Sequence, residues 1–122
     1  MEIILASKSP RRKELLQKLN LKFKIITSNI IESDINIQTN RPSKYCMYLA
    51  NAKCRDIATK YKKSLVIGAD TIVYYNQKII EKPINREDAM NQLYSLSDKT
   101  HLVYTGVSII INEMNYSYTF FD

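Results

Sequence analysis

Short apolar runs alternate with polar segments along the chain, and each run predicts a β-strand. The longest run, Leu65–Tyr75, is followed by Asn76-Gln77, which predicts a turn into a short partner strand. Two later runs surround the polar residues Asn112–Asn115 and predict a closing hairpin. The predicted strands are Glu2–Ala6, Phe23–Thr27, Leu65–Tyr75, Lys78–Ile80, His101–Ile111 and Tyr116–Phe121.

Helices are predicted between these strands, where the apolar positions recur every three or four residues. Ser9-Pro10 opens the first helix, because serine is a favoured N-cap and proline a favoured first helical residue. Pro42-Ser43 opens a second helix that runs to about Tyr61, and Asn85 caps a third. The segment Ser28–Asn40 is polar and irregular and predicts a loop. The apolar face of the first helix is Leu15, Leu16 and Leu19, and that of the second is Leu49, Ala50, Cys54, Ile57, Ala58 and Tyr61.

Strands separated by helices predict an α/β or α+β domain, a mixed twisted sheet with flanking helices. The order is not a clean βαβ repeat, because hairpins follow the central strand. With two glycines and three prolines, the 122 residues contain no flexible linker, so we expect a single domain over 1–122.

Composition narrows the function classes. The net charge of +6 favours anionic partners, either nucleotides or nucleic acid, but the basic residues are spread out, which argues against a dedicated nucleic-acid-binding arm. No apolar run approaches the roughly 18 residues needed to cross a bilayer, and no secretory signal is evident. Cys46 and Cys54 are expected to be small buried residues of a reduced cytoplasmic protein. With His101 as the one histidine, a standard zinc site is excluded and a Ser-His-Asp triad is disfavoured.

The segment from Ser7 to Arg12 is the first candidate site. It joins a predicted strand to a helix N-terminus, where free backbone N–H groups and the helix dipole attract anions. Ser7 and Ser9 add hydroxyl groups, and the two arginines that follow add guanidinium groups, which bind phosphate oxygens in pairs. The segment is either a phosphate site or a capped helix with solvated basic residues.

Asp70 is the second candidate, because it lies inside an apolar strand of Val, Ile and Leu. A carboxylate there requires a partner, a metal or a catalytic role. The competing interpretation is an aspartate that caps a helix or a turn. Lys82, held extended before Pro83, is a weaker candidate. Lys53 on the second helix and Glu32 in the polar loop say little by themselves.

Four motifs in this order together resemble the Maf family of nucleotide pyrophosphatases, over essentially the whole chain. They are Ile4–Leu16, Val66–Val73, Glu81-Lys82-Pro83 and Thr105-Gly106-Val107. The resemblance implies a fold shared with the inosine triphosphate pyrophosphatases, a mixed sheet in two lobes with the nucleotide in the cleft between them. It also implies cleavage of a nucleoside triphosphate between its α and β phosphates, with Mg²⁺ or Mn²⁺ as the cofactor.

The resemblance also implies roles for individual residues. Asp70 and Glu32 would hold the metal or activate water, with Asp70 as the catalytic base. Lys53 and Lys82 would neutralise the triphosphate. The substrate-binding residues would be Ser7, Ser9, Arg11, Arg12 and Thr71. The chain has two arginines after Ser-Pro and a threonine after the central aspartate. This pattern resembles that of the family branch that acts on dTTP and UTP, so the resemblance implies a pyrimidine base.

Family members continue beyond the point that corresponds to Asp122, so the chain resembles a member without its C-terminal third. We therefore expect an incomplete second lobe without the glutamine-containing motif that contacts the base. The chain is either a fragment or a natural short form. Its last hairpin would leave an open edge, which a second copy would cover in a homodimer. The alternative functions are a nucleotide-binding protein without turnover and a small basic nucleic-acid-binding protein.

Overall fold

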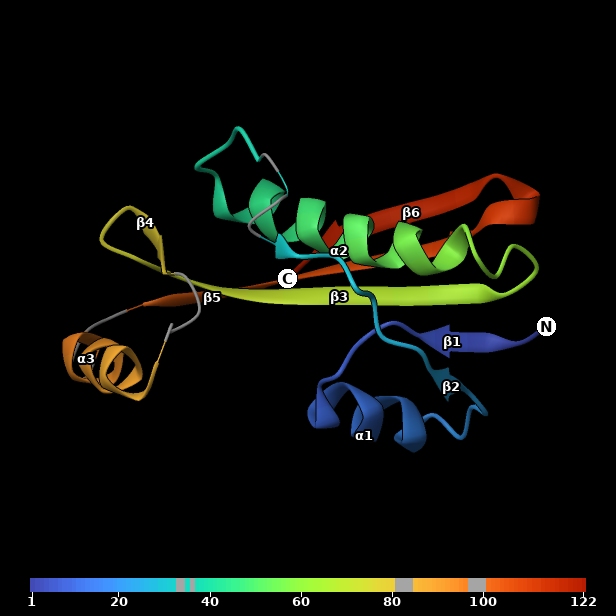
Figure 1. Ribbon diagram of the computed structural model, residues 1–122, viewed down its shortest axis with the longest axis horizontal. Coiled ribbons are helices and arrows are strands. Elements are labelled where there is room, and N and C mark those ends of the chain that lie inside the picture. The colour runs from blue at the N-terminus through green and yellow to red at the C-terminus, as the bar shows by residue number, and fades with distance from the viewer. Residues whose placement is uncertain (33–34, 36, 81–84, 97–100) are drawn as a thin grey trace.

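The computed structural model describes residues 1–32, 35, 37–80, 85–96 and 101–122. Its elements form a six-stranded mixed sheet with the order β2-β1-β3-β5-β6, and β4 pairs with the far end of β3 (Figure 1). None of the helices in these ranges is long and apolar enough to span a lipid bilayer. The strands are β1 (Ile3–Leu5), β2 (Lys24–Ile25), β3 (Leu65–Tyr75), β4 (Lys78–Ile80), β5 (Leu102–Ile111) and β6 (Tyr116–Phe121). The helices are α1 (Pro10–Lys18), α2 (Pro42–Ala58), α3 (Arg86–Leu96) and the short 3₁₀ helix η2 (Asn112–Met114).

Strand β3 organises the sheet, because it pairs with three other strands. It runs parallel to β1 and antiparallel to β4 and β5. Asn76 and Gln77 both have positive φ angles, 52° and 62°, which is typical of the tight two-residue turns that join hairpin strands. This turn brings β4 back onto β3. The register between β3 and β5 places Asp70 opposite Gly106.

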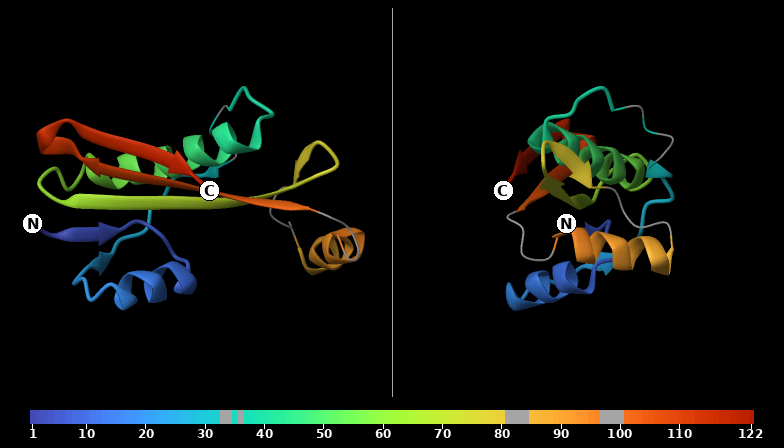
Figure 2. Two further views of the ribbon diagram at one scale, coloured as in Figure 1. Left: turned by 180° about the vertical axis from the view of Figure 1, so that it is seen from behind. Right: turned by 90° about the vertical axis from the view of Figure 1, so that its left-hand side faces the viewer.

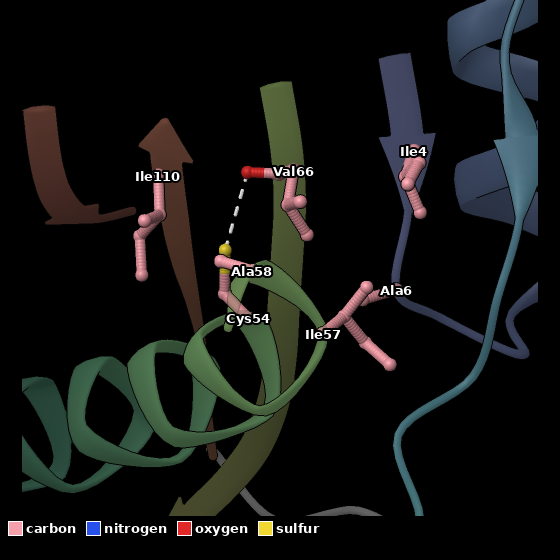
Figure 3. Close-up of a cluster of buried hydrophobic side chains, with 7 residues drawn as sticks. All are labelled: Ile4, Ala6, Cys54, Ile57, Ala58, Val66 and Ile110. Carbon is pink, nitrogen blue, oxygen red and sulfur yellow. Dashed lines mark hydrogen bonds between the residues drawn. The ribbon is translucent and has the colours of Figure 1, made fainter. Parts of the chain in front are cut away.

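Helix α2 lies across one face of β3, β5 and β6 (Figures 1 and 2). The core lies beneath it, where side chains from α2 meet those of β1, β3 and β5 (Figure 3). The close approach depends on two glycines. A Cβ atom at Gly68 would lie 2.7 Å from the Cβ atom of Cys54, and one at Gly106 would lie 2.7 Å from the backbone nitrogen of Met47. The buried residues of α2 are Cys46, Leu49, Ala50, Cys54, Ile57 and Ala58.

Helix α1 lies on the other side of the sheet, next to β1 and β2 (Figure 2). Ser9 caps it as predicted, since the Ser9 side chain accepts a hydrogen bond from the backbone nitrogen of Arg12. The apolar face predicted for this helix is not covered by the rest of the described structure, because no residue of α1 is buried. Leu15 and Leu19 are 54% and 65% exposed, and Leu16 is half-buried. Periodicity identifies an apolar face but not what covers it.

Most predicted elements are confirmed, including the full extent of β3, both hairpins and the Asn85 cap of α3. Several boundaries differ, those of β1 by one residue at each end and that of β5 by one residue at its start. Strand β2 covers only Lys24–Ile25, and α2 ends at Ala58, which leaves Tyr61 exposed rather than inward-facing. The described part of the Ser28–Asn40 segment is irregular, as expected.

The prediction that the two cysteines are small buried residues is also confirmed. Cys46 and Cys54 are both free and buried. Burial raises the pKa of the Cys54 thiol to about 11, so this residue acts as a small apolar side chain rather than as a thiolate.

Candidate functional site

A cavity of about 400 Å³ opens between the start of α1, the loop after β2, α2 and the middle of β3. This volume falls in the range of small-molecule sites. Its lining carries three cations and two carboxylates, a net charge of +1, which suits an anionic ligand. The lining residues are Ala6, Ser7, Lys8, Ser9, Arg12, Thr27, Ser28, Ile30, Glu32, Lys53, Ala69, Asp70 and Thr71.

Lys53 is the electrostatic centre of this cavity. Its Nζ donates hydrogen bonds to Glu32 Oε1 at 2.5 Å and to Asp70 Oδ1 at 2.7 Å. The three side chains come from different parts of the chain: α2, the loop after β2, and β3. The Lys53 side chain is only 18% exposed and that of Asp70 only 5%, so solvent screens this contact weakly.

The pKa of Lys53 reflects two opposing effects. Burial alone lowers the pKa of the ammonium group, but hydrogen bonds and charges from Asp70 and Glu32 outweigh burial and raise it above the ordinary value of 10.5. Lys53 therefore stays charged, and it accounts for the carboxylate inside an apolar strand. The Asp70 carboxylate can be buried within β3 because Lys53 on α2 forms an ion pair with it.

Arg12 forms a second polar junction, between α1 and β3. Its Nη1 donates to Ser7 Oγ at 3.0 Å and to the Ala69 carbonyl oxygen at 3.1 Å, and its Nη2 donates to Thr71 Oγ1 at 2.8 Å. Burial lowers the pKa of Arg12, and the nearby Asp70 charge opposes this effect. Three guanidinium hydrogen bonds thus go to the protein itself, and only the remaining N–H groups can serve a ligand.

The hydroxyl groups of the segment after β1 complete this wall of the cavity. Ser7 is buried, and its Oγ accepts hydrogen bonds from the Ser9 backbone nitrogen at 3.2 Å and from Arg12. With both lone pairs of Ser7 Oγ used, its proton is left to donate to a ligand oxygen. Thr71 Oγ1 also lies 3.1 Å from Thr105 Oγ1 on β5.

The structure brings together most of the residues singled out from the sequence. The exception is Arg11, which is exposed and does not line the cavity. Lys82 lies outside the described residues. Those that line the cavity are Ser7, Ser9, Arg12, Glu32, Lys53, Asp70 and Thr71.

Sequence reasoning missed several lining residues. Lys8 sits within the first motif but was not assigned a role, and Thr27, Ser28 and Ile30 lie where the chain leaves β2. The change from apolar to polar residues at Thr27-Ser28 was the available signal, since the ends of neighbouring parallel strands meet at one sheet edge.

Glu32 and Asp70 are the acidic residues in this lining that could hold a cation. Within the described ranges, no group of three or more His, Cys, Asp or Glu side chains is arranged around a common point. Two carboxylates are enough for Mg²⁺ when substrate phosphates supply further oxygen ligands, so the donor set fits such a metal.

A sequence profile described as "Maf-like protein" matches residues 2–121. The chain belongs to the Maf-like family. It is 46% identical over 108 residues to a protein of Ruminiclostridium cellulolyticum named dTTP/UTP pyrophosphatase, a match that covers 88% of this chain and 55% of that relative. A protein of the same name from Thermosipho melanesiensis is 47% identical over 110 residues, which cover 90% of this chain and 57% of the relative. This Maf-like chain thus spans just over half the length of these curated relatives.

Solved structures support the same fold. A HAM1 protein from Coxiella burnetii superimposes with a TM-score of 0.61 at 17% identity, covering 99% of this Maf-like chain and 69% of the other. The nucleoside-triphosphatase (dITP/XTP pyrophosphatase) of Mycobacterium abscessus gives a TM-score of 0.57 at 12% identity, covering 100% of this chain and 71% of the other. At such identities the likeness establishes the fold, which confirms the predicted fold class.

Proposed function

We propose that this protein hydrolyses a nucleoside triphosphate to the monophosphate and pyrophosphate. The observation that carries the proposal is the Lys53 ammonium group held between Asp70 and Glu32, in a cavity whose other wall presents Ser7, Ser9 and Arg12. Cations and hydroxyl donors bind a polyphosphate, and a carboxylate beside them accepts a proton from water. The names of the relatives support the same reaction class.

In this mechanism, Asp70 is the general base. Water attacks the α phosphorus, its proton passes to a carboxylate oxygen of Asp70, and the bond from the α phosphorus to the oxygen bridging to the β phosphorus breaks. Pyrophosphate leaves with that oxygen. Lys53 neutralises the negative charge that builds on the phosphates, and Arg12 and Ser7 orient them with their remaining N–H and O–H donors.

We further propose Mg²⁺ or Mn²⁺ as the cofactor, held by Glu32 and Asp70 together with substrate oxygens. When bound, such a metal lowers the charge barrier to attack on a polyphosphate. Lys53 already pairs with both carboxylates, so it fixes their side chains before any metal arrives. Lys82 keeps its proposed role of neutralising the triphosphate.

The reaction is tested by incubating the chain with each nucleoside triphosphate and Mg²⁺ or Mn²⁺, and assaying pyrophosphate and orthophosphate separately. Pyrophosphate as the first product supports the proposal, and orthophosphate rejects the assigned bond. Asp70→Asn, which is nearly isosteric, should reduce turnover by at least roughly a hundredfold. The control is Glu113→Gln, since Glu113 is an exposed carboxylate at the β5–β6 turn, outside the cavity lining.

A nucleotide-binding protein without turnover is the main alternative outcome. Saturable triphosphate binding with no pyrophosphate released by the wild-type chain would favour it. Binding of nucleic acid that weakens steeply with salt would favour the third class, a basic nucleic-acid-binding protein.

We propose a pyrimidine base, with thymidine and uridine triphosphates preferred over purine nucleotides. The support is the dTTP/UTP pyrophosphatase name shared by the relatives and the residues that follow Pro10 and Asp70. Thr71 lines the cavity, whereas Arg11 does not, so Thr71 is the better placed of the two to meet the base. A competition assay among the standard triphosphates and 7-methylguanosine triphosphate tests this base preference. Fastest turnover of a purine nucleotide would contradict a pyrimidine preference.

We also propose that the protein acts in the cytoplasm, where its substrate is present, and that it forms a homodimer. Strand β6 is the last strand of the sheet, and Tyr116, Tyr118 and Phe121 on it are exposed. An edge strand without charged residues readily pairs with another chain. Sedimentation analysis of the intact chain tests this, and a monomer at all concentrations contradicts it.

A further inference from the structure

Two side-chain contacts in the described part of the chain attach the loop that carries Glu32 to α2. The Lys53–Glu32 ion pair is one. The other is a hydrogen bond in which Ser28 Oγ donates to Asp56 Oδ2 at 2.9 Å. Ser28 Oγ in turn accepts a hydrogen bond from the Ile30 backbone nitrogen at 3.1 Å, which closes a small turn.

The spacing of these two attachments shows why the second one matters. Lys53 and Asp56 lie about one helical turn apart on α2, a rise of about 4.5 Å. Four residues of chain from Ser28 to Glu32 can extend to about 14 Å. The segment is therefore much longer than the separation it must span. With the ion pair alone, its backbone can adopt many conformations. Fixing Ser28 on Asp56 and folding the chain at Ile30 removes most of that freedom.

We propose that Asp56 is a positioning residue of the catalytic site, which acts through Ser28 to hold Glu32 against Lys53. The effect on turnover rests on the proposed function, but the effect on the loop does not. Asp56 does not line the cavity, so it is not expected to touch a ligand. The Asp56 side chain also lies 3.7 Å from Lys60 Nζ, a long and partly exposed ion pair of the kind that contributes little.

The loop is tested without any substrate. In Asp56→Ala, the Ile30 amide should exchange with solvent at least about tenfold faster, because its acceptor Ser28 is released. The Ile35 amide, which donates a hydrogen bond to the Glu32 carbonyl oxygen at 3.1 Å, should also exchange faster, because the backbone at Glu32 is no longer held. Lys60→Ala removes the ion pair but not the Ser28 contact, so both readouts should stay at the wild-type values.

The conservative change provides a rescue. Asp56→Asn removes the charge but keeps an oxygen that can accept from Ser28 Oγ, so it should restore slow exchange at Ile30. Ser28→Ala should reproduce the Asp56→Ala result, and it replaces that variant if Asp56→Ala does not fold. Unchanged exchange at Ile30 and Ile35 in both alanine variants would overturn the proposal.

Measurements of turnover provide a second test of the role of Asp56. Asp56→Ala should lower kcat by about tenfold, the smaller end for a lost hydrogen bond to a charged group, with KM nearly unchanged because Ser7 and Arg12 are untouched. In a Glu32→Gln background, the same substitution should have almost no further effect, since Asp56 acts through Glu32. Full additivity would contradict the proposal. If the wild-type chain releases no pyrophosphate, the proposed function fails, and the exchange measurements still decide the role of Asp56.

Discussion

The two helices that border the cavity are attached to the sheet in different ways. Helix α2 buries six side chains, and glycines beneath it let the helix backbone approach the sheet closely. Helix α1 buries none, and its described ties to β3 are the polar contacts of Arg12 with Ala69 and Thr71. Both helices have an amphipathic sequence, but only one has its apolar face covered.

This difference matches the chemistry that each wall supplies. In the proposed reaction, Lys53 on the α2 wall acts beside Asp70, and catalytic groups must be held to within about half an ångström. The α1 wall carries Ser7, Ser9 and Arg12, which are suited to phosphates. A wall held by hydrogen bonds can adjust to a ligand, whereas a wall held by packed side chains keeps its distances.

The largest effect should come from shortening one leucine on each helix. Leu49→Ala on α2 should lower the free energy of unfolding by about 2–5 kcal/mol, because Leu49 is only 2% exposed and leaves a cavity. Leu15→Ala on α1 should change it by no more than about 0.5 kcal/mol, because Leu15 is mostly exposed. Urea denaturation measures both. Equal losses would mean that α1 is as firmly packed in solution as α2.

A smaller effect is expected from Arg12→Lys, which keeps the charge but loses the planar fork that joins Ser7, Ala69 and Thr71. Triphosphate affinity should fall by about 1.5–3 kcal/mol, and monophosphate affinity by less. Calorimetric titration with both ligands measures this, and Arg55→Lys on the exposed surface of α2 is the matched control. Equal weakening for both ligands would place Arg12 away from the β and γ phosphates.

The smallest effect concerns pH. The pKa of Lys53 is raised above 10.5, despite the opposing effect of burial, by Asp70 and Glu32. Its contribution to stability is therefore fully present below pH 10.5 and is lost as the pH rises through the raised pKa. The difference in unfolding free energy between wild type and Lys53→Gln should be constant from neutral pH up to pH 10.5 and shrink above it. A difference that already shrinks between neutral pH and pH 10.5 would show that the pKa of Lys53 is not raised.

Local signals in the sequence predicted local structure well. Ser9-Pro10 and Asn85 placed two helix starts, and Asn76-Gln77 placed a hairpin turn, because each depends on a few neighbouring residues. The exposure of Leu15 has no such local signal, because burial depends on what covers a helix face rather than on the helix itself.

The candidate site shows a similar division. The motifs located Asp70 and Arg12, but the bridge from Glu32 through Lys53 to Asp70 joins residues that are distant in sequence. Arg11 and Arg12 differ for a simple geometric reason. Adjacent residues point about 100° apart around a helix, so only one of the two can face the cavity. No sequence signal indicated that the Arg12 guanidinium group would donate three hydrogen bonds to other atoms of the protein.

The glycines beneath α2 also limit how this pocket can be reshaped. Both glycines of the chain, Gly68 and Gly106, lie there, and any side chain at either position would push the helix outward. Since Lys53 is on that helix, enlarging the pocket from this side would move its ammonium group away from Asp70. Substitutions that change the size of ligand the pocket accepts must therefore be made in the loop after β2 or at the start of α1. Those segments can vary while the distance between Lys53 and Asp70 is kept.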